Sequence, residues 1–201
     1  MKKRSALMAG LVVFIVAGLI SLSESRAATI KGKIVSNRIG QFDNFVVYIK
    51  NVDPKHFKIP EEIVTSFQKN NQFYPKVLPM IAKRKVLFVN NDVSMHNVHA
   101  ANGSSVSFNY GIPPGAAAGP IHFPNEGETI LLCNIHPQMR GYILALQNPF
   151  FAKVDGEGYF TINKVPIGKY ELATWHSEFI SKEQTVTIEN EQITRLIRFT
   201  Y

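Results

Sequence analysis

Cysteine is nearly absent from this chain of 201 residues, which contains only one, Cys133. A single cysteine cannot form an internal disulfide, so a fold that depends on disulfides is excluded. Charged residues make up only 18% of the chain and hydrophobic residues 45%. This balance is that of a globular protein and excludes a chain that is disordered throughout. The sequence also lacks the series of long apolar runs that a polytopic membrane protein requires.

The one long apolar run, from Ala6 to Ile20, lies near the amino terminus. It follows the basic start Lys2-Lys3-Arg4 and precedes Ser25-Arg26-Ala27, whose small residues suit a signal peptidase. The run is shorter than the roughly 20 residues of a membrane-spanning helix. We therefore predict that residues 1–27 are a cleaved signal peptide, that the protein is periplasmic, and that it has no membrane attachment after cleavage.

Positive charge is modest in the predicted mature chain. Cleavage removes four basic residues and one acidic residue, which lowers the formal net charge from +7 to +4. The basic cluster that remains, Lys83-Arg84-Lys85, lacks the interleaved aromatics of a nucleic-acid-binding module. We expect no nucleic-acid partner, whereas a mild positive charge favours docking to an acidic protein.

Turn-forming residues are spread along the whole chain. The 13 Gly and 11 Pro show no period, and they alternate with short segments rich in Val, Ile, Phe and Tyr, which predicts an all-β fold of short strands. We expect strands at 29–34, 45–49, 73–80, 86–90, 106–108, 129–133, 142–146, 150–154, 158–162, 169–175, 184–188 and 193–199. Pro60-Glu61-Glu62 predicts one short helix within 60–70, and residues 111–120 are expected to form a loop.

Four potential metal ligands lie at the ends of two predicted strands. Cys133 ends one of them, and His136 and Met139 follow at intervals of three residues; upstream, His96 follows the strand 86–90. Taken singly, each has an ordinary explanation as a buried thiol, a surface imidazole or a core methionine. Together, two imidazoles, a thiolate and a thioether match the ligand set of a blue-copper site.

These motifs resemble the cupredoxins. The loop Cys133-x-x-His136-Pro-x-Met139 resembles the ligand loop of amicyanin, and Met95-His96-Asn97-Val98-His99 is similar to its upstream ligand segment. Over residues 71–147 the chain resembles periplasmic cupredoxins of the methylamine-utilisation type, through Asn71-x-Phe73-x-Pro75-x-Val-Leu-Pro79 and Phe88-x-Asn90-x-Asp92. The resemblance implies a Greek-key β-sandwich with one type 1 copper ion. Its implied ligands are His96 and His136 through ring nitrogens, Cys133 through its thiolate, and Met139 in the axial position.

The same resemblance implies a function. It indicates a protein that shuttles single electrons between redox partner proteins, which would dock near His136, and it does not indicate an enzyme. It also implies that Asn97 links the two ligand loops by hydrogen bonds. An apolar shell around the metal is expected from Ile112, Pro113, Pro114, Ile135 and Pro137.

Two alternative functions remain open. One is a copper-binding or copper-trafficking module without electron transfer. The other is a copper enzyme with a second metal site, to which His122 could contribute. Multicopper oxidases flank their cysteine with histidines, whereas Leu132 and Asn134 stand here, which disfavours the enzyme.

The carboxyl-terminal segment from Asp155 to Leu172 resembles the carboxypeptidase regulatory-like, or transthyretin-like, β-sandwich. That family begins with a Gly-x-Val strand and a Val-x-Val-Tyr strand, which are matched here by Gly32-Lys-Ile34 and Val46-Val-Tyr48-Ile49. We therefore predict that residues 28–52 and 148–201 form one discontinuous sandwich. The cupredoxin domain, 53–147, with its short helical connection at 60–70, would be inserted into it.

Overall fold

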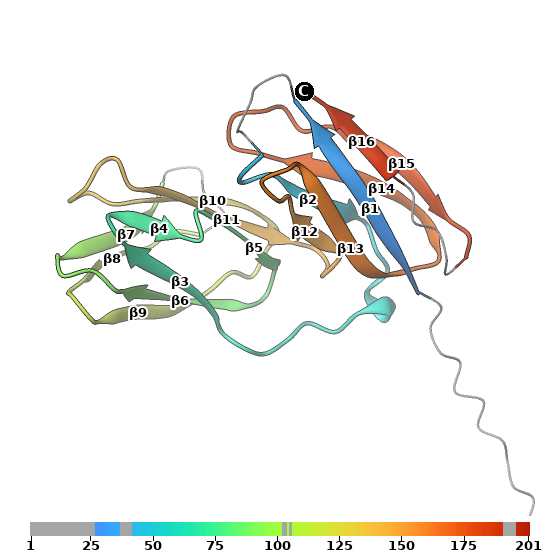
Figure 1. Ribbon diagram of the computed structural model, residues 1–201. Helices are drawn as coiled ribbons and strands as arrows, with labels where there is room; N and C mark the ends of the chain where they lie inside the picture. The colour runs from blue at the N-terminus through green and yellow to red at the C-terminus, as the bar shows by residue number, and fades with distance from the viewer. Residues whose placement is uncertain (1–26, 37–41, 102–103, 105, 191–195) are drawn as a thin grey trace, which may run out of the picture.

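The computed structural model describes residues 27–36, 42–101, 104, 106–190 and 196–201 (Figure 1). The predicted signal peptide, apart from Ala27, lies outside the described residues. Within them, regular secondary structure consists of β-strands and the single 3-10 turn η1 (Pro54–His56). The predicted all-β fold class is therefore confirmed. No helix in the described ranges is long and apolar enough to cross a membrane.

Nine strands form a pair of facing sheets, here called the first sandwich (Figure 1). One sheet has the order β5-β11-β10-β7-β8 and the other the order β4-β3-β6-β9. Their bounds are β3 Val64–Lys69, β4 Gln72–Tyr74, β5 Val77–Ile81, β6 Lys85–Asn90, β7 His96–Ala100, β8 Asn109–Ile112, β9 Ala117–His122, β10 Gly127–Leu132 and β11 Arg140–Leu146.

The core of the first sandwich follows from alternation along its strands. In β6, Val86, Phe88 and Asn90 face inward and are buried, whereas the residues between them are partly exposed, as the period of two of a strand requires. Together with Phe123 and Leu131, these apolar side chains form one buried cluster that also contains Cys133 and Met139. The candidate ligands therefore belong to the packed core.

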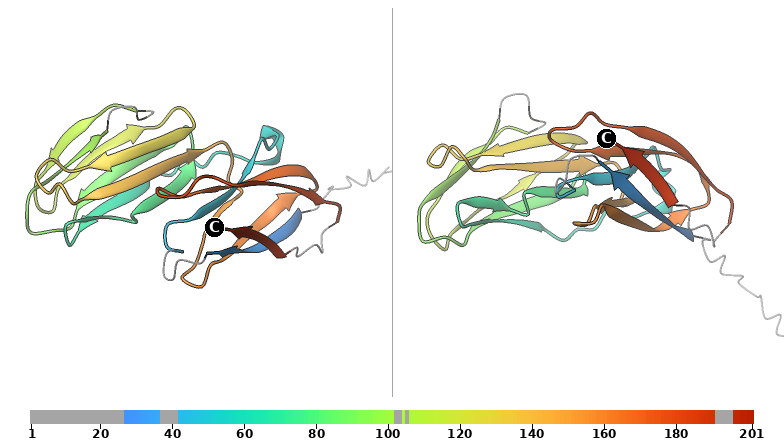
Figure 2. Two further views of the ribbon diagram at one scale, coloured as in Figure 1. Left: turned by 90° about the horizontal axis from the view of Figure 1, so that it is seen from above. Right: turned by 45° about the horizontal axis from the view of Figure 1, so that its top comes forward.

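Seven strands form the second sandwich, whose sheets have the orders β13-β1-β16 and β12-β2-β14-β15 (Figure 2). Their bounds are β1 Ala27–Val35, β2 Val46–Lys50, β12 Phe151–Lys153, β13 Tyr159–Pro166, β14 Gly168–Trp175, β15 Glu183–Ile188 and β16 Leu196–Thr200. Strand β1 pairs with β13 and β16, and β2 with β12 and β14. The first strands of the chain thus pair with its last ones, and the strands of the first sandwich lie between them in sequence.

The two sandwiches share an apolar contact, here called the inter-sandwich cluster. Val46 of β2 is buried with Val77, Tyr142, Leu144 and Leu146 of the first sandwich. The ring of Trp175 lies 5.4 Å from that of Tyr142, and its Nε1 donates a 2.8 Å hydrogen bond to Oε2 of Glu128. The second sandwich therefore packs mainly against β11, the strand that follows the Cys133 loop, with further contacts to β5 and β10.

The predicted helix within 60–70 is wrong. Residues 64–69 form strand β3, which pairs in parallel with β6 and antiparallel with β4. Its inward-facing residues, Ser66 and Gln68, are polar, so the sequence shows no apolar alternation. Asn70 and Asn71 both have a φ of 54°, which is the signature of a tight hairpin turn and not of a helix end.

Three further strand predictions need correction. The single strand expected at 73–80 is divided into β4 and β5, which belong to opposite sheets. The strand expected at 106–108 lies at β8, from Asn109 to Ile112, although Val106 and Phe108 do pack against the core. The loop expected at 111–120 contains most of β9, an edge strand with a register shift opposite Val86 and Phe88. Proline and glycine are tolerated at such an edge, which explains why the composition of β9 resembles that of a loop.

Candidate metal centre

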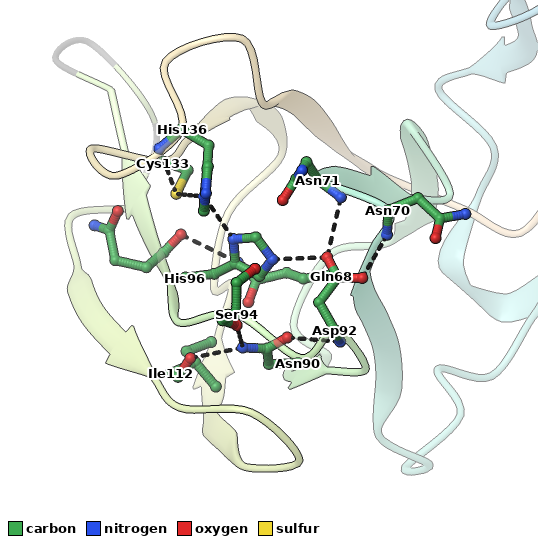
Figure 3. Close-up of polar contacts among 11 residues, drawn as sticks. Gln68, Asn70, Asn71, Asn90, Asp92, Ser94, His96, Ile112, Cys133 and His136 are labelled. Carbon is green, nitrogen blue, oxygen red and sulfur yellow. Dashed lines mark hydrogen bonds and ion pairs between the residues drawn. The ribbon is translucent and has the colours of Figure 1, made fainter.

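Three of the four predicted ligands converge at one end of the first sandwich (Figure 3). His96 is the first residue of β7 and not a loop residue as predicted, whereas Cys133 directly follows β10 and His136 lies in the loop between β10 and β11. The ligand atoms of these three side chains all lie within 4.8 Å of one another. The structure thus brings together residues from two distant parts of the chain.

The distances suit a shared metal ion. Nδ1 of His96 lies 2.9 Å from Nδ1 of His136, and Sγ of Cys133 lies 4.0 Å from the same His136 atom. With the bond lengths typical of zinc, about 2.0 Å to nitrogen and 2.3 Å to sulfur, two nitrogens on one ion lie about 3 Å apart. On the same lengths, a nitrogen and a sulfur lie at most about 4.3 Å apart. The His96–His136 distance and the Cys133–His136 distance are each compatible with a shared ion.

Met139 lies close to this group in the chain and in the core. It is 1% exposed and belongs to the same buried cluster as Cys133. Its backbone N–H donates a 2.9 Å hydrogen bond to the carbonyl oxygen of His136, which closes a tight turn. The next residue but one, Gly141, has a Cβ position only 2.8 Å from Cβ of Phe73, so a side chain there would push β11 and the turn away from the core.

Solvent reaches only one edge of the group. His96 is 0% and Cys133 3% exposed, whereas His136 is only partly covered. Of the five residues expected to form an apolar shell, Ile112 alone is buried; the other four, Pro113, Pro114, Ile135 and Pro137, are exposed. Those four lie at the surface, and the buried apolar surroundings come instead from the core side chains of the first sandwich.

Asp92 holds the far side of the His96 ring. Its Oδ2 lies 2.7 Å from Nε2 of His96, and its two oxygens accept bonds from the backbone N–H groups of Asn70 (2.6 Å) and Asn71 (3.0 Å). When Nε2 of His96 donates its hydrogen to this carboxylate, Nδ1 keeps its lone pair free. That lone pair then points toward Cys133 and His136. Desolvation, the largest single influence, raises the pKa of Asp92, but the bonds from Asn71, His96 and Asn70 outweigh it and lower the pKa.

Asn97 joins the two ligand segments, as predicted. Its Oδ1 accepts a 2.5 Å hydrogen bond from the backbone N–H of Asn134, the residue after Cys133. Its Nδ2 donates to Oδ1 of Asn109 on β8. Because the bond at residue 134 comes from the backbone N–H, this link does not depend on the side chain of Asn134.

Three supporting residues were given no role by the sequence analysis: Asp92, Asn90 and Gln68. Nδ2 of Asn90 donates to the carbonyl oxygens of Ser94 and Ile112, and its Oδ1 accepts from the N–H of Asp92. Gln68 bonds the carbonyl oxygen of Asn97. The turn between β3 and β4 could have been predicted from the sequence, because Asn70-Asn71 between two extended segments favours a hairpin. No local pattern indicates the long-range partner of Asn90 at Ile112, or that of Gln68.

The other described histidines do not belong to the metal-compatible group. His99 pairs with Leu132 and Asn109 in its sheet and is partly exposed. His122 is exposed at the end of β9, and its Nε2 lies 3.1 Å from the carbonyl oxygen of Lys83. His176 packs on Phe45 in the second sandwich, with ring centroids 4.4 Å apart. In the described part of the chain, His96, Cys133 and His136 form the one metal-compatible group of His, Cys, Asp and Glu.

Comparison with known proteins gives partial similarities. The family model described as polysaccharide lyase family 4, domain II, matches residues 141–196. No curated protein matches the chain. The carboxypeptidase regulatory-like resemblance of the second sandwich stays a prediction.

Among solved structures, a Cu-containing nitrite reductase from Thermus scotoductus is 24% identical, with a TM-score of 0.41; the match covers 57% of this chain but 28% of that one. A purple cupredoxin from Nitrosopumilus maritimus is 18% identical (TM-score 0.36; 41% of this chain and 98% of that one). Amicyanin from Paracoccus versutus is 21% identical (TM-score 0.38; 49% and 96%). The interpretation of the site rests on its own distances and burial.

Proposed function

We propose that this protein is a periplasmic type 1 copper protein that carries single electrons between redox partners and is not an enzyme. Its ligands would be Nδ1 of His96, Nδ1 of His136, the thiolate of Cys133 and, axially, the thioether of Met139. The observation that carries the proposal is the convergence of the first three ligand atoms within 4.8 Å. Thiolate, imidazole and thioether are together the donor set of such copper sites.

A bound copper ion would supply one-electron redox chemistry. The residues of the chain supply rigidity, which an electron carrier needs because ligand rearrangement adds to the barrier. Asp92 fixes the His96 ring, and the N–H of His136 lies 3.4 Å from Sγ of Cys133. Burial of Cys133 in the core excludes water and protects its thiol from oxidation.

Partners would dock around His136. This ring is partly exposed. Ile135, the residue before it, is 47% exposed, and Met95, the residue before His96, is 50% exposed. The predicted net charge of the mature chain favours a partner with an acidic surface. Export would follow from the predicted signal peptide.

The proposed domain division is 28–52 with 148–201 for the second sandwich and 53–147 for the cupredoxin domain. It is supported by the pairing of β1 and β2 with strands β12, β13, β14 and β16. The two points where the chain passes between the sandwiches are also joined by side chains. Nε2 of Gln147 donates to the carbonyl oxygen of Val52, and Nδ2 of Asn148 donates to that of Ile49.

The proposal is tested on purified protein loaded with Cu(II). We expect one copper per chain, an intense thiolate-to-copper charge-transfer band in the visible region, and reversible one-electron reduction. Cys133→Ser should abolish the band. Met139→Leu should keep the band and shift the reduction potential, whereas Met80→Leu, which replaces another buried methionine of the same core, should change neither.

The alternatives give different results. A colourless protein that binds one Cu(I) would contradict electron transfer and support copper trafficking. A second tightly bound metal that is required for turnover of a substrate would support an enzyme. Equal behaviour of Met139→Leu and Met80→Leu would remove Met139 from the ligand set.

A further inference from the structure

A fully buried glutamine crosses the interior of the first sandwich next to the candidate ligands. Gln68 lies on β3, is 0% exposed, and donates a 3.1 Å hydrogen bond from Nε2 to the carbonyl oxygen of Asn97. Strands β3 and β7 belong to opposite sheets. The side chain is therefore a direct polar link between the two sheets, and it reaches the ligand-bearing strand one residue after His96 (Figure 3).

The link continues to the other ligand segment. Asn97, whose carbonyl oxygen Gln68 binds, also accepts the backbone N–H of Asn134 through its own side chain. Asn134 directly follows Cys133. One chain of hydrogen bonds thus runs from β3 through Asn97, beside His96, to the peptide that follows the thiol.

Gln68 is a poor choice for stability alone. Its Oε1 is buried and has no hydrogen-bond partner among the described residues. Nearly all buried polar atoms are paired, and leaving an acceptor unpaired costs more than a typical hydrogen bond contributes. An apolar side chain of similar length would remove this unpaired acceptor, although it would also remove the hydrogen bond to the Asn97 carbonyl oxygen. Buried polar residues that lower stability are expected where a functional site needs a specific contact.

We propose that Gln68 is a positioning residue for the candidate metal centre, which holds the Asn97 peptide and thereby fixes His96 and Cys133 relative to each other. The effect on copper rests on the proposed function. The link itself belongs to the metal-free protein and can be measured there.

The test compares Gln68→Met with Ser66→Ala, which alters the other buried polar side chain of β3. In the metal-free protein, amide hydrogen exchange is followed at Asn134. We expect at least severalfold faster exchange in Gln68→Met and wild-type exchange in Ser66→Ala. The melting temperature of Gln68→Met should stay close to that of the wild type, because the variant removes the unpaired Oε1 as well as the hydrogen bond to Asn97. In the copper-loaded protein we expect a shifted visible band and reduction potential and about 10–100-fold weaker metal retention against a chelator.

Wild-type exchange at Asn134 together with an unchanged spectrum, potential and copper retention in Gln68→Met would overturn the proposal. So would equal changes in both variants, because these would indicate general loosening of β3. If the wild-type protein binds no copper or stays colourless, the proposed function fails, and the exchange measurement alone then decides whether Gln68 positions the segment.

Discussion

The two sandwiches of this chain differ most in what they bury. The first holds six of the eight buried polar residues found in the described part of the chain: Ser66, Gln68, Asn90, His96, Asn97 and Thr129. The second has a core of apolar side chains, with Thr174 as its one buried polar residue, while Asn148 lies at the crossing between the two. Both are sandwiches of short strands, so the fold does not require the polar interior of the first.

This difference shows that the core of the first sandwich contains polar side chains that apolar packing alone does not require. Buried polar groups need partners, and in the first sandwich Gln68, Asn90 and Asn97 bond the segments that carry His96 and Cys133. In the second sandwich, the buried hydroxyl of Thr174 bonds the backbone of Lys182 and the hydroxyl of Tyr201, which lie outside the group of candidate ligands. The candidate ligands lie in the first sandwich, and the second sandwich packs against it through the inter-sandwich cluster.

The largest predicted effect separates the two cores. Phe45 in the second sandwich and Phe88 in the first are both 0% exposed. Either change to Ala should destabilise the protein by about 3–5 kcal/mol in denaturant unfolding. Of the two, we expect Phe88→Ala to weaken copper retention in the still-folded protein, because Phe88 belongs to the cluster that contains Cys133. If Phe45→Ala weakened copper retention as much as Phe88→Ala, the metal centre would depend equally on the cores of both sandwiches.

A matched pair of turn carboxylates sharpens the comparison. Asp155 accepts the backbone N–H groups of Glu157 and Tyr159, much as Asp92 accepts those of Asn70 and Asn71, but it touches no candidate ligand in the contacts described. Each change to Ala should cost about 1–3 kcal/mol of stability. Copper affinity, measured by competition with a chelator, should fall about 10–100-fold in Asp92→Ala and stay at the wild-type value in Asp155→Ala. Unchanged affinity in Asp92→Ala would show that the His96 contact is dispensable.

The contact between the sandwiches should contribute less. Trp175→Leu removes the ring pair with Tyr142 and the bond to Glu128, for a loss of about 1–2 kcal/mol. We expect its unfolding, followed by circular dichroism, to separate into two transitions. Glu128→Gln keeps an acceptor oxygen and serves as the milder control. A single transition at the wild-type midpoint in Trp175→Leu would refute a stabilising contact.

The smallest predicted effects concern pH, and they fall in different ranges for the two sandwiches. Burial lowers the pKa of His176 below its ordinary value of 6.5. The unfolded chain therefore binds this proton more readily, and stability should decline as the pH falls below 6.5 toward the lowered pKa. His176→Phe should remove this decline in the metal-free protein, as measured by melting temperature against pH.

The titration of Asp92 should affect stability only at lower pH. Its pKa in the folded protein lies below the ordinary value of 3.8. Its contribution to stability is therefore fully present well above pH 3.8 and is lost as the pH falls through the folded-state pKa. Asp92→Asn should weaken the dependence of the melting temperature on pH in that acid range. Between pH 5 and 6.5 the dependence should stay as in the wild type. A change confined to the higher range would contradict the assignment.

The sequence predicted the strands best where one face is apolar. Strands β6, β10 and β14 lie within one or two residues of the segments expected for them. It failed at β3, whose inward face carries Ser66 and Gln68, and at β9, whose Ala, Gly and Pro look like a loop. In both cases pairing with β6 decides the conformation, and a partner strand 15 or more residues away leaves no trace in the local pattern.

The order of potential ligands along the chain and the all-β class could be inferred from the sequence alone, because spacing within a loop and alternation within a strand are local properties. The link through Asn97 was expected only from the resemblance to a known family, since it joins residues 97 and 134. The tertiary structure decided what depends on the meeting of distant segments. It set the 2.9 Å approach of two imidazoles 40 residues apart, the contact of Asp92 with both the turn and the ligand ring, and the cross-sheet bond of Gln68. Such contacts arise because sheet pairing and core packing place these residues together, and no residue pattern within either segment specifies that geometry.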